Sequence, residues 1–579
     1  MNIWKMKILS AAAVLFSVIL SLDAQSGGEL RLADIFCDGA IIQRELPLPI
    51  WGTDLPAKKI KVSFAGQELS ATADKDGRWK VVASAVKEGG PFQIEVQSET
   101  GKAAVKDIYS GEVWIFAGES LLDRTIDRIP AEADGAPQKQ IRYFMAPRQF
   151  ARAPCDTLPG RWKNFASGTE DMPALAYYFA DEIRRKLNVP VGIIVCSVPE
   201  SLSHAWMHKD SIKGIKQLGQ IESYVEVIQN YEMKISGTYR GLQEFSRADD
   251  DIRYSGALKR FQMWAKSNDA KKILKNNAEA EQWQEKIQDW VENSMQRESK
   301  GIALLEEQKT WPLAIQIASG IIADPRTSGA RPSALFNGMI NPLVPYSIKG
   351  FVFCQGESDA SWERGQVYFD ILSNLIKNWR STWNKAQNQK KGDLPFIYMQ
   401  LQGIKDDKII SAEECSLLRL SQASVIEKVN VTAMVVSYDI IPDAGKDAVI
   451  QPGNMKEEAQ RLALSALGRF YNQKVVCSGP IFDSVTVGDG SLRLKFKYAD
   501  SGLIAGKTGS TEKIRGFETG SPDGLFKEAE VTADKNFIVI KTPGVVNNVR
   551  YGWGLKPEAN LYNKEGLPAV PFTVNLTDK

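Results

Sequence analysis

Two long stretches of the chain, residues 109–210 and 330–475, alternate short apolar runs with segments of helical character. The apolar runs span residues 113–117, 191–195, 350–354, 395–399 and 431–436. The helical segments include residues 174–187, 367–383 and 456–471. Because strands that alternate with helices are typical of a parallel sheet covered on both faces, the sequence predicts an α/β domain.

The residues on either side of this domain show short strands separated by turns, as at 60–64 and 92–96 and again at 491–497 and 537–541. A length of 579 residues favours about three or four domains. The expected division is a signal peptide at 1–24, an N-terminal β-sandwich at 25–108, an α/β domain at 109–474 with a charged helical insertion at about 213–311, and a C-terminal β-rich module at 475–579.

The first residues have the order of a secretory signal. Lys5 and Lys7 form a basic region, residues 8–22 are apolar or small, and residues 22–24 resemble a cleavage site before Gln25. A membrane anchor is the alternative, but this run is short for a span of about 20 residues. We therefore expect export to the periplasm or the cell exterior, and no integral membrane segment after cleavage.

The composition argues against nucleic acid as a partner and against a metal site. Lysine and arginine number 72 against 70 acidic residues, so the chain lacks the basic excess that nucleic-acid binding requires. The six cysteines show no CxxC spacing, and His204 and His208 are the two histidines. We therefore expect no metal site and no cofactor, while both disulfides and buried free thiols remain open for the cysteines.

Ser120 is the candidate nucleophile, because it follows the apolar run 113–117 directly, on a predicted strand-to-loop turn. Three further loops carry polar residues: 196–206, 355–359 and 447–454. Open α/β sheets bind ligands beyond the carboxyl ends of their strands. We expect the four loops to converge on one pocket there.

Short motifs in matching order relate the chain to a known family. They include Ile42-Gln43-Arg44, Trp51-Gly52, Asp76-Gly77-Arg78-Trp79, Gly111-Glu112-Val113-Trp114, Asn337-Gly338-Met339-Ile340-Asn341-Pro342-Leu343, Gln355-Gly356-Glu357-Ser358, Gly516-Phe517-Glu518 and Val549-Arg550-Tyr551-Gly552-Trp553. On these residues the chain resembles the sialate O-acetylesterases, which belong to the SGNH (GDSL-like) hydrolases. The resemblance implies an SGNH-type three-layer α/β/α domain with a parallel sheet. It also implies an exported carbohydrate ester hydrolase that removes O-acetyl groups from a glycan partner such as O-acetylated sialic acid.

The resemblance assigns roles to several site residues. Ser120 matches the nucleophile, within Gly-Glu-Ser-Leu-Leu where the family has Gly-Gln-Ser-Asn-Met. The family's catalytic histidine falls on Gln451, and Asp447 is the nearest preceding carboxylate. Gln355, in a loop that also holds Glu357, would help to hold the oxyanion.

The same resemblance implies that two parts of the catalytic machinery are altered. The family's Gly-Gly-Thr loop, which donates to the oxyanion, falls on Pro199-Glu200-Ser201. Proline has no N–H to donate, and Glu200 brings negative charge toward an oxyanion. Glutamine at 451 accepts hydrogen bonds but cannot take a proton near neutral pH.

Three interpretations follow. In the first, the protein is an active esterase in which His204, Glu119 or Glu200 replaces the histidine base. In the second, it is a catalytically degenerate relative that binds a glycan or a protein partner. A third, purely structural interpretation places the function on the β-rich modules.

We predict that the exported protein begins at Gln25, because the basic, apolar and small regions end at Ala24. N-terminal sequencing of secreted protein measures this. An intact Met1 on a membrane-embedded protein would contradict the prediction.

Overall fold

The computed structural model describes residues 30–125, 140–164, 172–213, 215, 261–262, 265–266, 274–299, 331–361, 364–387, 393–404, 410–440, 452–488, 490–508, 512–542 and 544–577. The expected signal peptide at 1–24 lies outside these residues. So does most of the expected insertion at 213–311.

The α/β domain is built on six parallel strands in the described residues, with a seventh, antiparallel strand at one edge. Their spatial order is β10-β9-β11-β8-β12-β13-β14. These strands are β8 (Lys102–Gly118), β9 (Ile141–Met145), β10 (Trp162–Asn164), β11 (Val191–Ser197), β12 (Gly350–Cys354), β13 (Phe396–Met399) and β14 (Thr432–Val435). The predicted parallel sheet is confirmed, and five of its strands lie on the five apolar runs.

Both faces of the sheet are covered, because successive side chains of a strand point to opposite sides. Trp114 and Phe116 pack with α2 (Ala174–Leu187) and α12 (Pro452–Phe470). Val113, Ile115 and Ala117 pack in the other core, with the helices on the second face. Those helices are α10 (Tyr368–Gln387) and α11 (Ala412–Lys428). The strands are therefore apolar throughout, as buried parallel strands are.

One strand, β8, continues from the N-terminal module into the α/β domain. Its first half pairs with β7, and its second half with β11 and β12. The boundary expected at residues 108 and 109 therefore falls inside a strand. The other strands of this module are β1 (Arg31–Leu32), β2 (Ile41–Gln43), β3 (Leu48–Thr53), β4 (Lys59–Phe64), β5 (Gln67–Thr72), β6 (Arg78–Ala83) and β7 (Gly89–Gln97).

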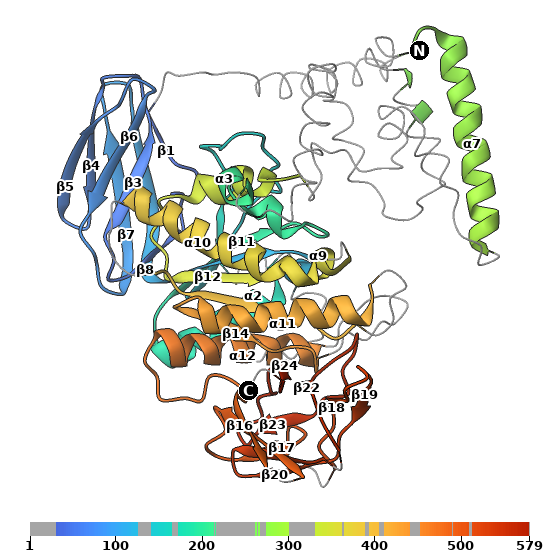
Figure 1. Cartoon of the computed structure of the whole chain (residues 1–579). Coiled ribbons are helices and arrows are strands. Elements are labelled where there is room, and N and C mark those ends of the chain that lie inside the picture. The colour runs from blue at the N-terminus through green and yellow to red at the C-terminus, as the bar shows by residue number, and fades with distance from the viewer. Residues whose placement is uncertain are drawn as a thin grey trace, which may run out of the picture.

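The C-terminal module is β-rich, and Figure 1 shows it in red, on a different side of the α/β domain from the blue N-terminal strands. Its described strands form sheets of order β15-β16-β21-β20, β17-β23 and β19-β18-β22-β24. They are β15 (Ile481–Gly488), β16 (Ser491–Lys497), β17 (Leu503–Ala505), β18 (Phe517–Gly520), β19 (Phe526–Glu528), β20 (Val531–Asp534), β21 (Phe537–Lys541), β22 (Asn548–Tyr551), β23 (Leu561–Asn563) and β24 (Phe572–Asn575). The mixed α/β class with additional β-rich sheets is thus confirmed.

Short helices complete the described fold. They are η4 (Ser203–Trp206), α3 (Lys209–Lys213), η7 (Phe336–Ile340), η8 (Asn341–Leu343), η9 (Gly365–Val367) and, within the insertion, the longer α7 (Asn277–Ser299). In Figure 1, α7 stands apart from the three modules. Among the described helices, none combines the length and the apolar character needed to cross a membrane.

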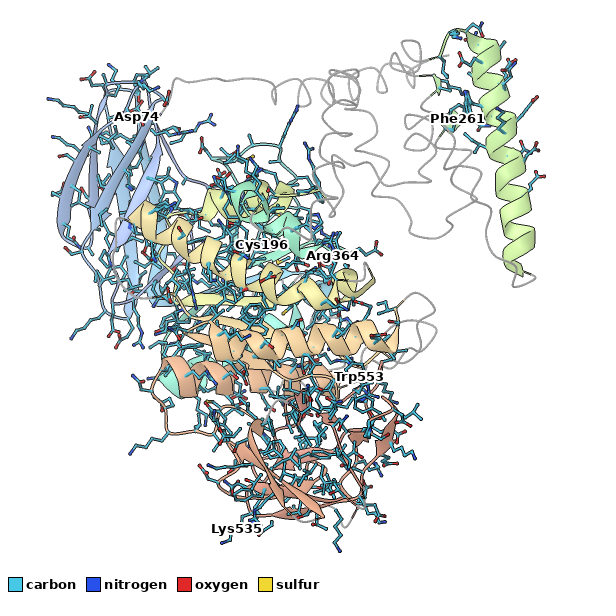
Figure 2. All side chains as sticks on the ribbon, in the orientation of Figure 1. Asp74, Cys196, Phe261, Arg364, Lys535 and Trp553 are labelled. Carbon is cyan, nitrogen blue, oxygen red and sulfur yellow. The ribbon has the colours of Figure 1, made fainter. Side chains whose placement is uncertain are left out.

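Buried charged side chains join the modules. Glu112, on β8, accepts hydrogen bonds from Arg44 at 2.6 Å and from the hydroxyl of Tyr471 at 2.8 Å. Arg419, on α11, donates to the carbonyls of Leu401 at 2.9 Å and of Gly554 at 2.6 Å. Figure 2 labels the neighbouring Trp553 near α11. Because a buried charge that loses its partners is costly, these contacts hold the modules in place.

We predict that Gly118→Ala destabilises the protein by about 3 kcal/mol or more, since the left-handed backbone and a steric clash both oppose a side chain. Gly118 has φ +142°, and a Cβ there would lie 1.9 Å from the carbonyl oxygen of Cys354. Urea unfolding measures the free energy of unfolding.

Gly66→Ala is the matched control, because Gly66 has φ +78° with nothing within 4 Å of the added Cβ. It should cost about 1–2 kcal/mol, the backbone term alone. Equal losses in the two variants would contradict the role of the close contact with β12.

Candidate active site

The loop that carries Ser120 follows the central strand β8. The N–H of Glu119 donates to the carbonyl of Cys354 at 2.9 Å. The 3₁₀ turn η1 (Ser120–Asp123) begins directly afterwards. The backbone of Ser120 therefore lies at the carboxyl end of the sheet, where open α/β folds bind ligands. Its side chain lies outside the described structure.

The buried side chain of Glu119 joins this loop to the loop after β12. Its carboxylate accepts hydrogen bonds from the N–H of Gly356 at 3.1 Å and from the N–H and hydroxyl of Ser358 at 3.3 and 2.5 Å. It also shares a hydrogen bond with the carboxyl of Glu357, the first residue of α9 (Glu357–Ser361). Two predicted site residues, Glu119 and Glu357, are thus in direct contact.

Burial raises the pKa of Glu119 well above its usual value of 4.5, and the Glu357 carboxyl raises it further. The hydrogen bonds from Ser358 and Gly356 lower this pKa but do not offset the burial. The hydrogen bond to the Glu357 carboxyl therefore favours the protonated form of Glu119. The resembling family has glutamine at position 119, which would donate the same hydrogen bond without a titrating proton.

The loop after β11 places Pro199 and Glu200 in a turn. Glu200 has φ +56°, and its side chain is exposed. Glycine, the residue of the resembling family, enters this backbone region without strain. Ser201 is buried, and its hydroxyl accepts a hydrogen bond from the indole N–H of Trp206 at 3.0 Å. The turn therefore presents an exposed carboxylate and, at Pro199, a backbone without an N–H.

Gln355 is buried where β12 ends, and it links this loop to the loop after β11. Its amide nitrogen donates to the carbonyl of Ser201, so one of its two N–H groups is already engaged. Its amide oxygen Oε1 is buried without a hydrogen-bond partner. Together with the contacts of Glu119, this bond shows that three of the four loops meet, as far as they are described.

His204 is buried in a network of hydrogen bonds. Its Nδ1 lies 2.7 Å from Nη1 of Arg364, which also contacts a carboxylate oxygen of Asp359 at 3.2 Å. A guanidinium only donates hydrogen bonds, so Nδ1 is the acceptor and the proton of a neutral ring is on Nε2. Figure 2 labels Arg364 in the part of the molecule where Figure 1 labels α9. The lone pair of Nδ1 is therefore occupied by the hydrogen bond from Arg364.

Asp447 and Gln451 lie outside the described residues. The structure resumes at Pro452, the first residue of α12, so Gln451 directly precedes this helix. The convergence of the fourth loop on Ser120 stays a prediction.

Glu458, on α12, is a candidate that the sequence analysis missed. It is fully buried, and its Oε1 accepts a hydrogen bond from the amide of Gln402, while Oε2 has no partner. Burial raises the pKa of Glu458 to about 8, although Gln402, Arg461 and Arg124 act to lower it. The sequence held one indication of this role. Glu458 lies seven residues after Gln451, almost two helical turns, so it belongs to the same side of the predicted helix.

Arg124 is a second residue that the sequence analysis missed. It follows η1 directly, and its Nη1 atom is buried without a hydrogen-bond partner. Burial lowers the pKa of Arg124, whereas the carboxyls of Glu458 and Glu357 act to raise it. These three charged groups therefore lie close enough to influence one another. No short-range sequence pattern predicts that Arg124 lies near Glu458 and Glu357.

The described site offers buried hydrogen-bonding groups as its evident chemical resource. Among the described residues, no group of three or more His, Cys, Asp and Glu side chains is placed to hold a metal ion. The carboxyls of Glu119 and Glu357 are hydrogen-bonded to each other, and Arg124 and Glu458 carry unpartnered polar atoms. Such atoms suit a polar ligand.

We predict that Glu119→Gln stabilises the protein increasingly as pH rises. A carboxyl whose folded pKa is raised contributes most stability below its unfolded pKa and loses it as pH rises through the folded pKa. The window therefore begins near the usual value of 4.5 and extends upward. Glutamine does not titrate, so the difference in free energy of unfolding between variant and wild type should grow by about 1 kcal/mol or more from pH 5 to pH 8.

Urea unfolding at several pH values measures this difference, with the exposed Glu413→Gln as control. A difference that stays constant with pH would contradict a raised pKa at Glu119.

Comparisons with known proteins bear on the origin of this site. No protein-family model matches the chain. The sialate O-acetylesterase of Mus musculus is 21% identical in an alignment 608 residues long. The alignment covers 98% of this chain and 98% of the mouse protein. The sialate O-acetylesterase of Homo sapiens is also 21% identical, over 97% of this chain and 96% of its own.

A solved structure shares the fold. A carbohydrate acetylesterase from Xanthomonas citri superposes with a TM-score of 0.68 at 24% identity, covering 94% of this chain and 99% of its own. The sequence relatives span nearly the whole chain, including the modules on both sides of the α/β domain. The chain is therefore homologous to the sialate O-acetylesterases over nearly its whole length.

Proposed function

We propose that this protein is a carbohydrate-binding member of its family that hydrolyses acetyl esters very poorly. One observation carries the binding proposal: Arg124 Nη1, Gln355 Oε1 and Glu458 Oε2 are all buried without partners. A buried polar group without a hydrogen bond costs about 1–3 kcal/mol. A sugar, which is rich in hydroxyl and acyl oxygen atoms, would satisfy such groups. The named activity of the homologues supports a glycan as the ligand.

Weak hydrolysis follows from the missing base. A serine hydroxyl needs a base to take its proton, and Gln451 cannot do so. The geometry also disfavours two replacements, since Glu119 shares a proton with Glu357 and His204 Nδ1 is engaged by Arg364. Loss of one triad member leaves about 10³–10⁴-fold acceleration over water in serine proteases.

The oxyanion site adds a second obstacle. Pro199 provides no N–H, and Glu200 adds a negative charge. One N–H of the Gln355 amide already donates to the carbonyl of Ser201. Removal of one oxyanion donor costs about 10²–10³-fold in rate. We therefore expect the two defects to reinforce each other.

Hydrolysis of O-acetyl groups on sialic acid or a related glycan is the second candidate. The retained Ser120 at the end of β8 favours it, together with the homologues' activity. We place either function outside the cytoplasm, on the basis of the N-terminal signal pattern.

We predict that the wild type has little Ser120-dependent esterase activity and that Gln451→His alone restores little. Triad members act as a unit, so their effects are far from additive. Pro199→Gly, Glu200→Gly and Gln451→His together should recover more than the single changes combined. The measurement is the initial rate on an acetylated aryl ester and on O-acetylated sialic acid, with the rate of Ser120→Ala subtracted.

Robust turnover by the unmodified protein, absent in Ser120→Ala, would overturn the proposal of weak hydrolysis. Binding is tested separately, by calorimetry of Ser120→Ala with acetylated and unacetylated oligosaccharides, because this variant cannot consume the ligand by the serine route. If no carbohydrate binds, the binding proposal fails.

A further inference from the structure

Two unpartnered polar atoms, on Arg124 and Glu458, lie on elements far apart in sequence. Glu458 is fully buried on α12, and the amide nitrogen of Gln402 donates to its Oε1. A donor at Oε1 leaves Oε2 as the oxygen that carries the proton of a neutral carboxyl. Oε2 has no partner, and neither has Nη1 of Arg124.

We propose that Arg124 and Glu458 form a subsite that binds the carbonyl oxygen of a neutral acyl group, such as the acetyl group of a sugar. This inference rests on the proposed carbohydrate binding and names the part of the ligand that the two residues recognise.

Burial, rather than the neighbouring charges, keeps Glu458 neutral at neutral pH. The groups that act on it or share its neighbours are Arg124, Arg461, Asp439, Cys354 and Glu357. Of these, Arg461 is already paired with Asp439 at 2.6 Å and with Glu457 at 2.6 Å. Burial dominates and raises the pKa of Glu458 to about 8, so Oε2 carries a hydrogen at pH 7.

The two atoms are then both donors, and neither can satisfy the other. Nη1 of a guanidinium donates only, and Oε2–H of a neutral carboxyl donates as well. A carbonyl oxygen has two lone pairs and accepts both hydrogen bonds. An acyl group therefore completes this pair of residues.

The surrounding charge favours a neutral ligand over an anion. The carboxyl of Glu357, which is hydrogen-bonded to Glu119, already acts electrostatically on Arg124. Asp439 lies close enough to Glu458 to raise its pKa. An added carboxylate would meet these negative charges in a buried site, where repulsion is strong.

Ionisation of Glu458 should close the subsite. Above pH 8, Oε2 becomes an acceptor, and Arg124 is the nearby cation able to pair with it. The acyl oxygen then loses both donors. The apparent affinity should follow the protonated fraction of Glu458, falling about 10-fold between pH 6.5 and pH 9.

The test is calorimetry of full-length Ser120→Ala protein with three sugars: N-acetylglucosamine, 6-O-acetylglucose and glucose. At pH 6.5, at least one acetylated sugar should bind 10-fold or more tightly than glucose, and the one that does so identifies an amide or an ester as the source. Its affinity should fall about 10-fold at pH 9. Equal affinity for all three sugars would overturn the inference while leaving carbohydrate binding intact.

Two further variants, each in the Ser120→Ala background, separate recognition from general damage to the fold. Glu458→Gln keeps the acceptor for Gln402 and offers an N–H in place of Oε2–H, so it should bind equally well at both pH values. Arg124→Met removes the donor and should bind at least 10-fold more weakly at pH 6.5. Glu413→Gln, exposed on α11, should keep the pH dependence of the parent. A pH decline that persists in Glu458→Gln, or unchanged affinity in Arg124→Met with intact thermal unfolding, would overturn the subsite.

Discussion

The described architecture depends on the pairing of one strand with four others. β8 pairs with β2 and β7 in the N-terminal module and with β11 and β12 in the α/β sheet. It therefore fixes the position of the N-terminal module relative to the α/β domain, and it ends at the loop of Ser120. At that end the backbone of Gly118 approaches β12 so closely that no side chain fits. The same contact sets the distance between the Ser120 loop and the Gln355 loop.

Buried polar groups then determine the shape of the site. Glu119 binds the loop after β12, and Gln355 binds the loop after β11. Asp359 accepts hydrogen bonds from the N–H and hydroxyl of Ser203 at 3.0 and 2.6 Å. Each contact uses a donor or an acceptor for a hydrogen bond within the protein, so that group is not free for a ligand. A site whose acids and amides are engaged in this way has fewer groups left to move protons.

The charged and titratable groups of the site are physically connected. Glutamic acid in place of glutamine at 119 adds a buried carboxyl beside Glu357, and the pair must hold a proton. Arg124 and Glu458 add a cation and a second raised pKa near the same loops. A histidine base works best where nearby groups stabilise its positive charge. A site assembled around neutral acids and a buried guanidinium favours hydrogen bonding to uncharged oxygen atoms instead.

Sequence pattern by itself determined the sheet, its covering helices and the meeting of three of the four loops, because burial on both faces demands apolar strands and parallel strands end at one edge. It also singled out Ser120 and Glu119 through their position after a strand. Only the tertiary structure decided that Arg124 approaches Glu458, which is more than 300 residues away, that Nδ1 of His204 accepts from Arg364, and that Gln355 donates to Ser201. These contacts depend on side-chain rotamers and on loops from different elements, and no local periodicity encodes either of them.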